Sequence, residues 1–118
     1  MKNQAYRMTL LFDFYGEMLT DRQKEFYDLY YNEDLSLSEI AENYKMSRQG
    51  VRDAIVRAEA VLTELEDKTG LIRRFQEQTA QLQELQSLTE AARKANSDPT
   101  VADYLRRIQE LCDKLTQE

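Results

Sequence analysis

The sequence predicts an all-α protein in which a helix-turn-helix domain without a wing is followed by a long C-terminal helical hairpin. Only 3 Gly and 1 Pro interrupt 118 residues rich in helix-forming Leu, Glu, Gln, Ala, Arg and Lys. Two serine caps frame a short turn, and apolar residues recur at three-and-four spacing over most of the chain. We expect residues 1–69 to form the helix-turn-helix domain with its support helices, and residues 70–118 to form the hairpin.

Two support helices are predicted before the motif. The first covers residues 4–15 and ends at Gly16, with an apolar face made of Ala5, Met8, Leu11, Phe12 and Tyr15. Thr20 and Gln23 have the spacing of a capping box and begin the second helix. The buried stripe of that helix contains Phe26, Leu29 and Tyr30.

Nine of the eleven aromatic residues lie before residue 45. Such a density fits a surface on which bases stack, and it also fits an aromatic core. The core is the stronger interpretation, because these rings recur at helical spacing and no basic residues are interleaved with them.

The helix-turn-helix is predicted from two helix starts. Ser36 and Glu39 form a capping box, and the apolar periodicity then breaks at Lys45-Met46 before Ser47 offers a second N-cap. The turn lacks glycine, so Lys45 or Asn43 must take the left-handed conformation, which costs a residue other than asparagine about 1 kcal/mol. The second motif helix then continues to Gly70, which resembles a C-cap glycine.

The second motif helix has one apolar and one polar side. Its inward residues are Val51, Ala54, Ile55, Ala58, Val61, Leu62 and Leu65. The opposite side carries Arg48, Gln49, Arg52, Asp53 and Val56. Residues 45–58 hold 4 basic and 1 acidic side chains, so of the three segments 1–44, 45–58 and 59–118 they are the only one with a net positive charge, in a chain with a net charge of −6. This pattern fits either a surface for an anionic partner or an ordinary solvated helix face.

Each polar residue of this helix start has a role in a nucleic-acid interface. Arg48 and Arg52 lie one turn apart and could bind guanine edges or phosphates, while Gln49 could pair with adenine. Ser47 and the first amides suit a phosphate. Lys45 and Arg57 lie at the two ends of the face and are expected to contact the nucleic-acid backbone. Gly50 either permits a close backbone approach or loosens the helix start.

The C-terminal hairpin is predicted from two further helical patterns. Residues 71–95 carry an apolar side made of Ile72, Phe75, Leu82, Leu85, Leu88, Ala92 and Ala95. Asp98 and Pro99 then suit the cap and first position of a last helix, whose stripe is Val101, Tyr104, Leu105, Ile108, Leu111, Cys112 and Leu115. The hairpin has more apolar edge than it can hide, so we expect a homodimer.

Several functions are excluded by what the sequence lacks. With no His, 1 Cys and no glycine-rich phosphate loop, it predicts no enzyme, no metal site and no cofactor. Acidic pairs such as Glu66-Asp67 are interpreted as solvated helix ends. No apolar run reaches the roughly 20 residues of a membrane span, and the N-terminal residues lack the basic-then-apolar pattern of a signal peptide, so a cytoplasmic protein is expected. Cys112 is interpreted as a small buried hydrophobe.

Residues 19–66 resemble region 4 of bacterial sigma factors, the part that reads promoter DNA, and the whole chain is similar to the YlxM (p13-like) family of small helix-turn-helix proteins of Gram-positive bacteria. By motif position, Ser47, Arg48, Gln49 and Arg52 correspond to the reading positions of sigma factors. The acidic C-terminal half departs from that pattern. The resemblance implies a nucleic-acid-binding regulator with DNA as its partner. The alternative that it implies is an accessory factor that binds the RNA or the GTPase of the signal recognition particle.

Overall fold

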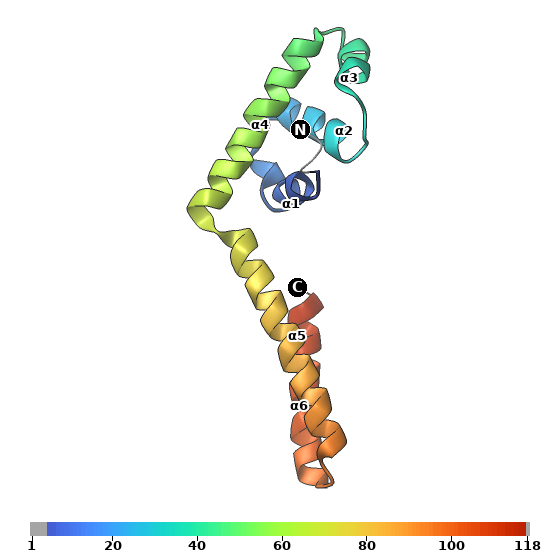
Figure 1. Cartoon of the computed structure of the whole chain (residues 1–118), viewed down its shortest axis with the longest axis vertical. Helices are drawn as coiled ribbons and strands as arrows, with labels where there is room; N and C mark the ends of the chain where they lie inside the picture. Colours follow the sequence, from blue (N-terminus) through green and yellow to red (C-terminus); the bar gives the residue numbers. More distant parts are fainter. Residues whose placement is uncertain (1–4, 118) are drawn as a thin grey trace. The chain divides into compact units, whose positions relative to one another are not determined.

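The computed structural model describes residues 5–117, which form six α-helices and one 3-10 turn with no strand among them (Figure 1). The elements are α1 (Ala5–Tyr15), η2 (Gly16–Met18), α2 (Asp21–Tyr31), α3 (Leu37–Tyr44), α4 (Arg48–Thr69), α5 (Leu71–Ala95) and α6 (Pro99–Gln117). The predicted all-α class is therefore confirmed. Gln4, expected to open the first helix, lies outside the described residues.

The chain divides into two compact units, Met1–Ile72 and Arg73–Glu118. The first unit contains helices α1 to α4, and its limit lies slightly beyond the start of α5. Ile72 explains this limit, because its side chain is fully buried in the core of the first unit. The apolar spacing of residues 71–95 predicted Ile72 on the apolar side of the hairpin, but its side chain packs in the core of the first unit instead.

An aromatic core holds the first unit together. Tyr27 is fully buried, stacks on Phe12 with ring centroids 5.3 Å apart, and donates its hydroxyl proton to the Met8 carbonyl at 2.5 Å. Tyr31 lies against Tyr27 with 4.7 Å between centroids and donates to Glu59 Oε2 at 2.8 Å. Most aromatic residues before the motif are thus core residues, with the exposed Tyr6 as an exception, and the core accounts for them without base stacking.

Most predicted helix ends are confirmed. Thr20 with Gln23, and Ser36 with Glu39, each form a complete capping box at the start of α2 and α3. Gly70 takes the left-handed conformation after α4, with φ 62°. These interactions join residues a few positions apart, so the local sequence determines them.

Glu66 corrects one interpretation made from the sequence. Its side chain is buried near the end of α4, where it accepts hydrogen bonds from the Tyr15 hydroxyl at 2.6 Å and from the Ile72 backbone N–H at 2.9 Å. Both donors come from other helices, α1 and α5. Glu66 is therefore a structural residue of the first unit, whereas the neighbouring Asp67 is exposed.

The second unit is the antiparallel hairpin of α5 and α6 (Figure 1). Asp98 caps α6 as predicted, since its Oδ1 accepts from the Thr100 N–H at 2.8 Å. Cys112 is buried with 2% of its surface exposed, which confirms its interpretation as a buried hydrophobe. None of the helices within residues 5–117 combines the length and apolarity that crossing a bilayer requires.

Candidate nucleic-acid interface

Helices α3 and α4 form the helix-turn-helix, and both contact α2 (Figure 1). Ile40 of α3 and Val51 and Ile55 of α4 are fully buried, as their spacing predicted. Burial of these residues fixes the rotation of α4 about its axis, because one side must face the core. The residues at 100° to 180° from that side then face outward.

The turn between the two helices depends on Lys45, which ends α3 in the left-handed conformation with φ 55° and ψ 44°. The N–H of the next residue, Met46, donates to the Ala41 carbonyl at 3.0 Å and closes the turn. A lysine in this conformation is destabilising by about 1 kcal/mol relative to glycine. Of the two residues that the sequence offered for this position, the structure selects Lys45, and its side chain is exposed.

The start of α4 is capped by Ser47, whose Oγ accepts from the Gly50 N–H at 3.0 Å. A Cβ on Gly50 would lie only 3.1 Å from that same oxygen and 3.5 Å from the Met46 Cε. The missing side chain therefore leaves room for the cap. The group that this space accommodates is the cap hydroxyl of the protein itself, so the two roles considered for Gly50, a close backbone approach and a loose helix start, stay predictions.

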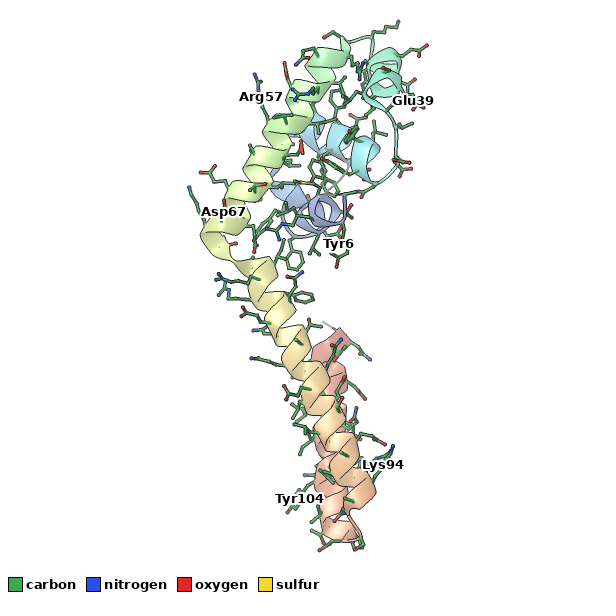
Figure 2. All side chains as sticks on the ribbon, in the orientation of Figure 1. Tyr6, Glu39, Arg57, Asp67, Lys94 and Tyr104 are labelled. Carbon is green, nitrogen blue, oxygen red and sulfur yellow. The ribbon has the colours of Figure 1, made fainter. Side chains whose placement is uncertain are left out.

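The predicted site residues are all exposed on the outer side of the motif: Lys45, Ser47, Arg48, Gln49, Arg52 and Arg57. Figure 2 shows Arg57 on the side of α4 that points away from α1, α2 and α3. Within residues 5–117, none of Lys45, Arg48, Arg52 and Arg57 forms a salt bridge. Other cations of the same unit are paired, as Lys24 is with Glu17 and Lys68 is with Glu64 at 3.0 Å.

Gln49 and Asp53 are joined on the outward side of α4. The Gln49 Nε2 donates to Asp53 Oδ1 at 2.9 Å, and both residues are exposed. This bond occupies one donor of the amide and leaves its oxygen free to accept. It also places a carboxylate between the arginines of the first turns and Arg57, where it opposes the approach of phosphate.

Arg22 of α2 belongs to the same surface, although the sequence analysis did not single it out. Its guanidinium lies 3.1 Å from the Met46 Sδ and 5.3 Å from the centroid of the Phe26 ring. These contacts hold the guanidinium beside Met46 in the turn. The i to i+4 spacing of Arg22 and Phe26 can be seen in the sequence. The contact between Arg22 and Met46 joins residues 24 positions apart, so it could be found only from the structure.

Comparisons with known proteins agree with this motif. The family described as "Putative helix-turn-helix protein, YlxM / p13 like" matches residues 2–100. The UPF0122 protein YlxM of Bacillus subtilis is 40% identical over 102 residues, which cover 86% of this chain and 93% of the relative. A UPF0122 protein of Bacillus thuringiensis is 40% identical over 115 residues, covering 98% of this chain and 99% of the relative.

A UPF0122 protein of Desulforamulus reducens is 47% identical over 85 residues, covering 72% of this chain and 73% of the relative. With a family match over most of its length and relatives of this similarity, the chain belongs to the YlxM/p13-like family of helix-turn-helix proteins. The resemblance seen in the sequence is confirmed.

Proposed function

We propose that this protein binds duplex DNA with the first turns of α4 and acts as a regulatory DNA-binding protein. The observation that carries the proposal is a set of cations around the start of α4 that form no salt bridge with a carboxylate of residues 5–117: Arg22, Lys45, Arg48, Arg52 and Arg57. Among helix-turn-helix proteins, this is the part of the second helix that enters the major groove.

The proposed roles follow from position on the surface. Arg48 and Arg52 lie on the first two turns of α4 and reach base edges or phosphates, while Gln49 can accept a hydrogen bond through its free oxygen. Lys45 and Arg22 flank the turn and Arg57 lies at the far end, so these three contact the phosphate backbone. The Ser47 hydroxyl and the unpaired amides of the first turn add neutral donors.

The charge of the rest of the chain sets the expected strength of binding. The net charge is −6, whereas residues 45–58 of the motif carry a charge of +3, so attraction to phosphate is local. Binding should be weak at physiological salt and rise steeply as salt is lowered, because each phosphate contact releases counterions.

The test is a fluorescence anisotropy titration with duplex DNA at two or more salt concentrations. We expect the double variant Arg48→Ala/Arg52→Ala to weaken binding at least tenfold and to lower the slope of log K against log salt by about 1.8. The variant Arg93→Ala/Lys94→Ala removes the same charge from the second unit and serves as the control. Equal affinity in the two double variants would refute the role of α4.

The same titration can be carried out with RNA or a protein in place of duplex DNA. The family resemblance also implies the RNA and the GTPase of the signal recognition particle as partners, and the same cations would meet an RNA backbone. A titration in which that RNA binds tighter than duplex DNA, and in which Arg48→Ala/Arg52→Ala weakens only the RNA complex, would replace DNA by RNA as the ligand. Binding of the GTPase alone would contradict the proposal.

A further inference from the structure

We propose that the α5–α6 hairpin is a dimerisation surface and that a second copy of the chain covers its exposed apolar side. The inference rests on residues of the second unit alone. It is therefore independent of nucleic-acid binding, and either proposal can fail without the other.

Helix α6 presents an open apolar stripe. Its members are separated by three and four residues in alternation and are between 39% and 60% exposed: Val101, Tyr104, Ile108, Leu111 and Leu115. This alternation is the one on which helices pack together in coiled coils and helix bundles. The residues of α6 that the hairpin does bury lie on another side, since Cys112 is 2% exposed while its neighbour Leu111 is 59% exposed.

Helix α5 extends the same surface. Leu85 and Leu88 are 44% and 61% exposed, whereas Thr89, one residue further on, is 5% exposed. Leu82 and Leu85 of α5 and Leu115 of α6 line one shallow groove, so the open stripes of the two helices lie on the same side of the hairpin. We call this side the apolar face. The hairpin thus buries Thr89 and leaves leucines open, in agreement with the expectation that it has more apolar edge than it can hide.

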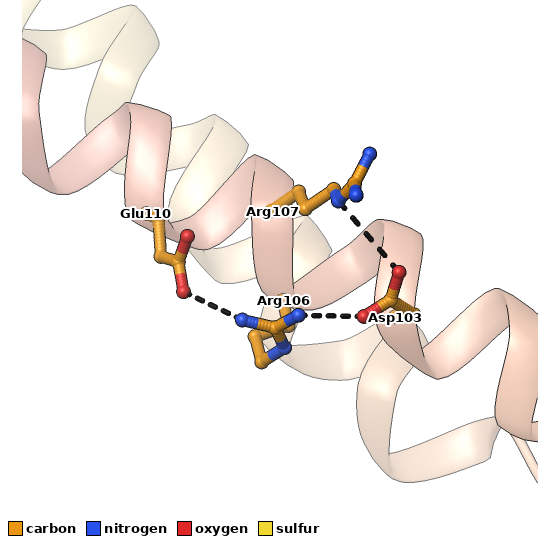
Figure 3. A network of polar contacts seen from close by, with 4 residues as sticks. All are labelled: Asp103, Arg106, Arg107 and Glu110. Atoms are coloured by element: carbon orange, nitrogen blue, oxygen red, sulfur yellow. Dashed lines mark hydrogen bonds and ion pairs between the residues drawn. The ribbon is translucent and has the colours of Figure 1, made fainter.

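The opposite side of α6 is a polar surface (Figure 3). Arg106 contacts Asp103 at 2.6 Å and Glu110 at 2.9 Å, and Arg107 contacts Asp103 at 3.6 Å. These ion pairs lie along one helix in contact with water, where they need no further partner. The side of the hairpin that gains most from being covered is therefore the apolar face.

The size of the apolar face fits a second copy. Helix α6 has 19 residues and is about 28 Å long. Two helices side by side are about 20 Å wide, so the face measures on the order of 600 Å² in projection. A specific interface buries about 800 Å² of accessible surface per partner. An identical hairpin has the same length and covers the whole face.

Charge at the two edges selects the arrangement of the copies. The apolar face has two long borders, one along α5 and one along α6. A helix turns by about 100° per residue, which places Glu84 at the border along α5 and Lys114 at the border along α6. Both are exposed, and neither forms a salt bridge within residues 5–117. The hydrogen bond from Gln86 Nε2 to Thr116 Oγ1, at 3.4 Å, shows that these parts of the two helices lie at similar heights along the hairpin.

Two face-to-face arrangements with twofold symmetry exist for a helical hairpin. If the axis runs along the helices, α5 of one copy faces α6 of the other, and Glu84 meets Lys114 of the second copy. If the axis runs across the helices, α5 faces α5 and carboxylates meet carboxylates. We infer the first arrangement, because its edges are complementary.

The association itself is tested by sedimentation of the full chain at micromolar concentrations. The expected mass is that of a dimer, twice the 13.9 kDa of the chain. Leu88→Glu should raise the dimer Kd at least about 100-fold, because the twofold symmetry buries two uncompensated charges. Ser87→Glu adds the same charge at the next residue, which lies outside the apolar face, and should leave the Kd within about twofold. Leu111→Glu repeats the test from α6.

The orientation is tested by a charge exchange. Glu84→Lys and Lys114→Glu should each raise the Kd about fivefold, since an exposed pair at an interface edge is weak, and the double variant should restore it. A chain that sediments as a monomer, or a dimer that Leu88→Glu and Leu111→Glu leave intact while circular dichroism shows full helicity, would overturn the proposal. A dimer without restoration in the double variant would overturn the arrangement.

Discussion

The Tyr15 hydroxyl donates to Glu66 Oε1 at 2.6 Å, and this hydrogen bond joins α1 to the end of α4. Glu66 also accepts from the Ile72 N–H, so one buried carboxylate satisfies a hydroxyl and a backbone amide in the first turn of α5. Burial, together with the hydrogen bond to Glu66, raises the pKa of Tyr15 above its ordinary value of 10.0. The two residues are 51 positions apart and connect the beginning and the end of the first unit.

The first prediction concerns this bond. Tyr15→Phe should lower the free energy of unfolding by about 1–3 kcal/mol, because it takes one donor from a buried carboxylate. Urea denaturation followed by circular dichroism measures the change. Tyr6→Phe is the matched control, since Tyr6 is 79% exposed and its loss should change stability by less than about 0.5 kcal/mol. Equal stability of the two variants would show that the hydrogen bond between Tyr15 and Glu66 does not stabilise the fold.

A second prediction separates strain from charge at the turn. Lys45→Gly should raise the free energy of unfolding by about 1 kcal/mol, because glycine adopts the left-handed conformation without steric cost. It should also weaken DNA binding and lower the salt slope by about 0.9, the contribution of one phosphate contact. Lys45→Ala removes the same charge and keeps the strain, so it should lose affinity without gaining stability. Stabilisation by both variants would assign the effect to charge.

The part of the fold that was predictable from the sequence is the part made by local interactions. Thr20, Ser36, Ser47 and Asp98 begin their helices as predicted, because a capping side chain binds an amide two or three residues away. Ile72 was misassigned, since its apolar character suits either unit and only the packing against the first unit decides between them.

The candidate site also has features that the local sequence predicts and features that it does not. Exposure of Gln49 follows from the burial of Val51 and Ile55, which periodicity predicts. Arg48 lies within about 60° of both buried residues around the helix, so periodicity does not predict its exposure at the helix start. The placement of Arg22 beside Met46 and the bond between Gln49 and Asp53 depend on side-chain conformations that no spacing rule specifies.

The third prediction concerns Asp53, whose carboxylate repels the phosphates of DNA and so weakens binding. Asp53→Asn should raise the affinity for duplex DNA about threefold to tenfold at low salt, because it removes a negative charge from the surface that faces phosphate. The asparagine oxygen can still accept from Gln49, so any change reports charge alone. Asp67→Asn makes the same change at the far end of α4 (Figure 2) and should have no such effect. If Asp67→Asn raised the affinity for duplex DNA by the same factor, the DNA would not bind specifically at the surface around Asp53.

The fourth prediction concerns alkaline pH. Burial raises the pKa of Tyr27 and of Tyr31 well above 10.0, and for Tyr31 the hydrogen bond to Glu59 adds to the effect. Below about pH 10 these tyrosines are protonated in the folded and unfolded chain alike, so their contribution is fully present. Above that pH the unfolded chain loses protons that the folded chain keeps, and the free energy of unfolding falls by about 1.4 kcal/mol per pH unit for each tyrosine.

Urea denaturation at several values of pH above 10 measures this slope. Tyr31→Phe should reduce the slope by about 1.4 kcal/mol per pH unit, the share of one tyrosine. Tyr104→Phe, at an exposed position of α6, should leave the slope unchanged. An unchanged slope in Tyr31→Phe would show that its hydroxyl titrates alike in both states.

Burial of the lone cysteine gives the second unit a chemical reporter of its own. Cys112 is the single thiol of the chain and is 2% exposed within the hairpin, so a thiol reagent reaches it only when α5 and α6 separate. The rate of labelling therefore measures the opening of the hairpin, while the alkaline titration of the buried Tyr27 and Tyr31 reports on the first unit. The two units of this small protein can be followed separately in one unmutated chain.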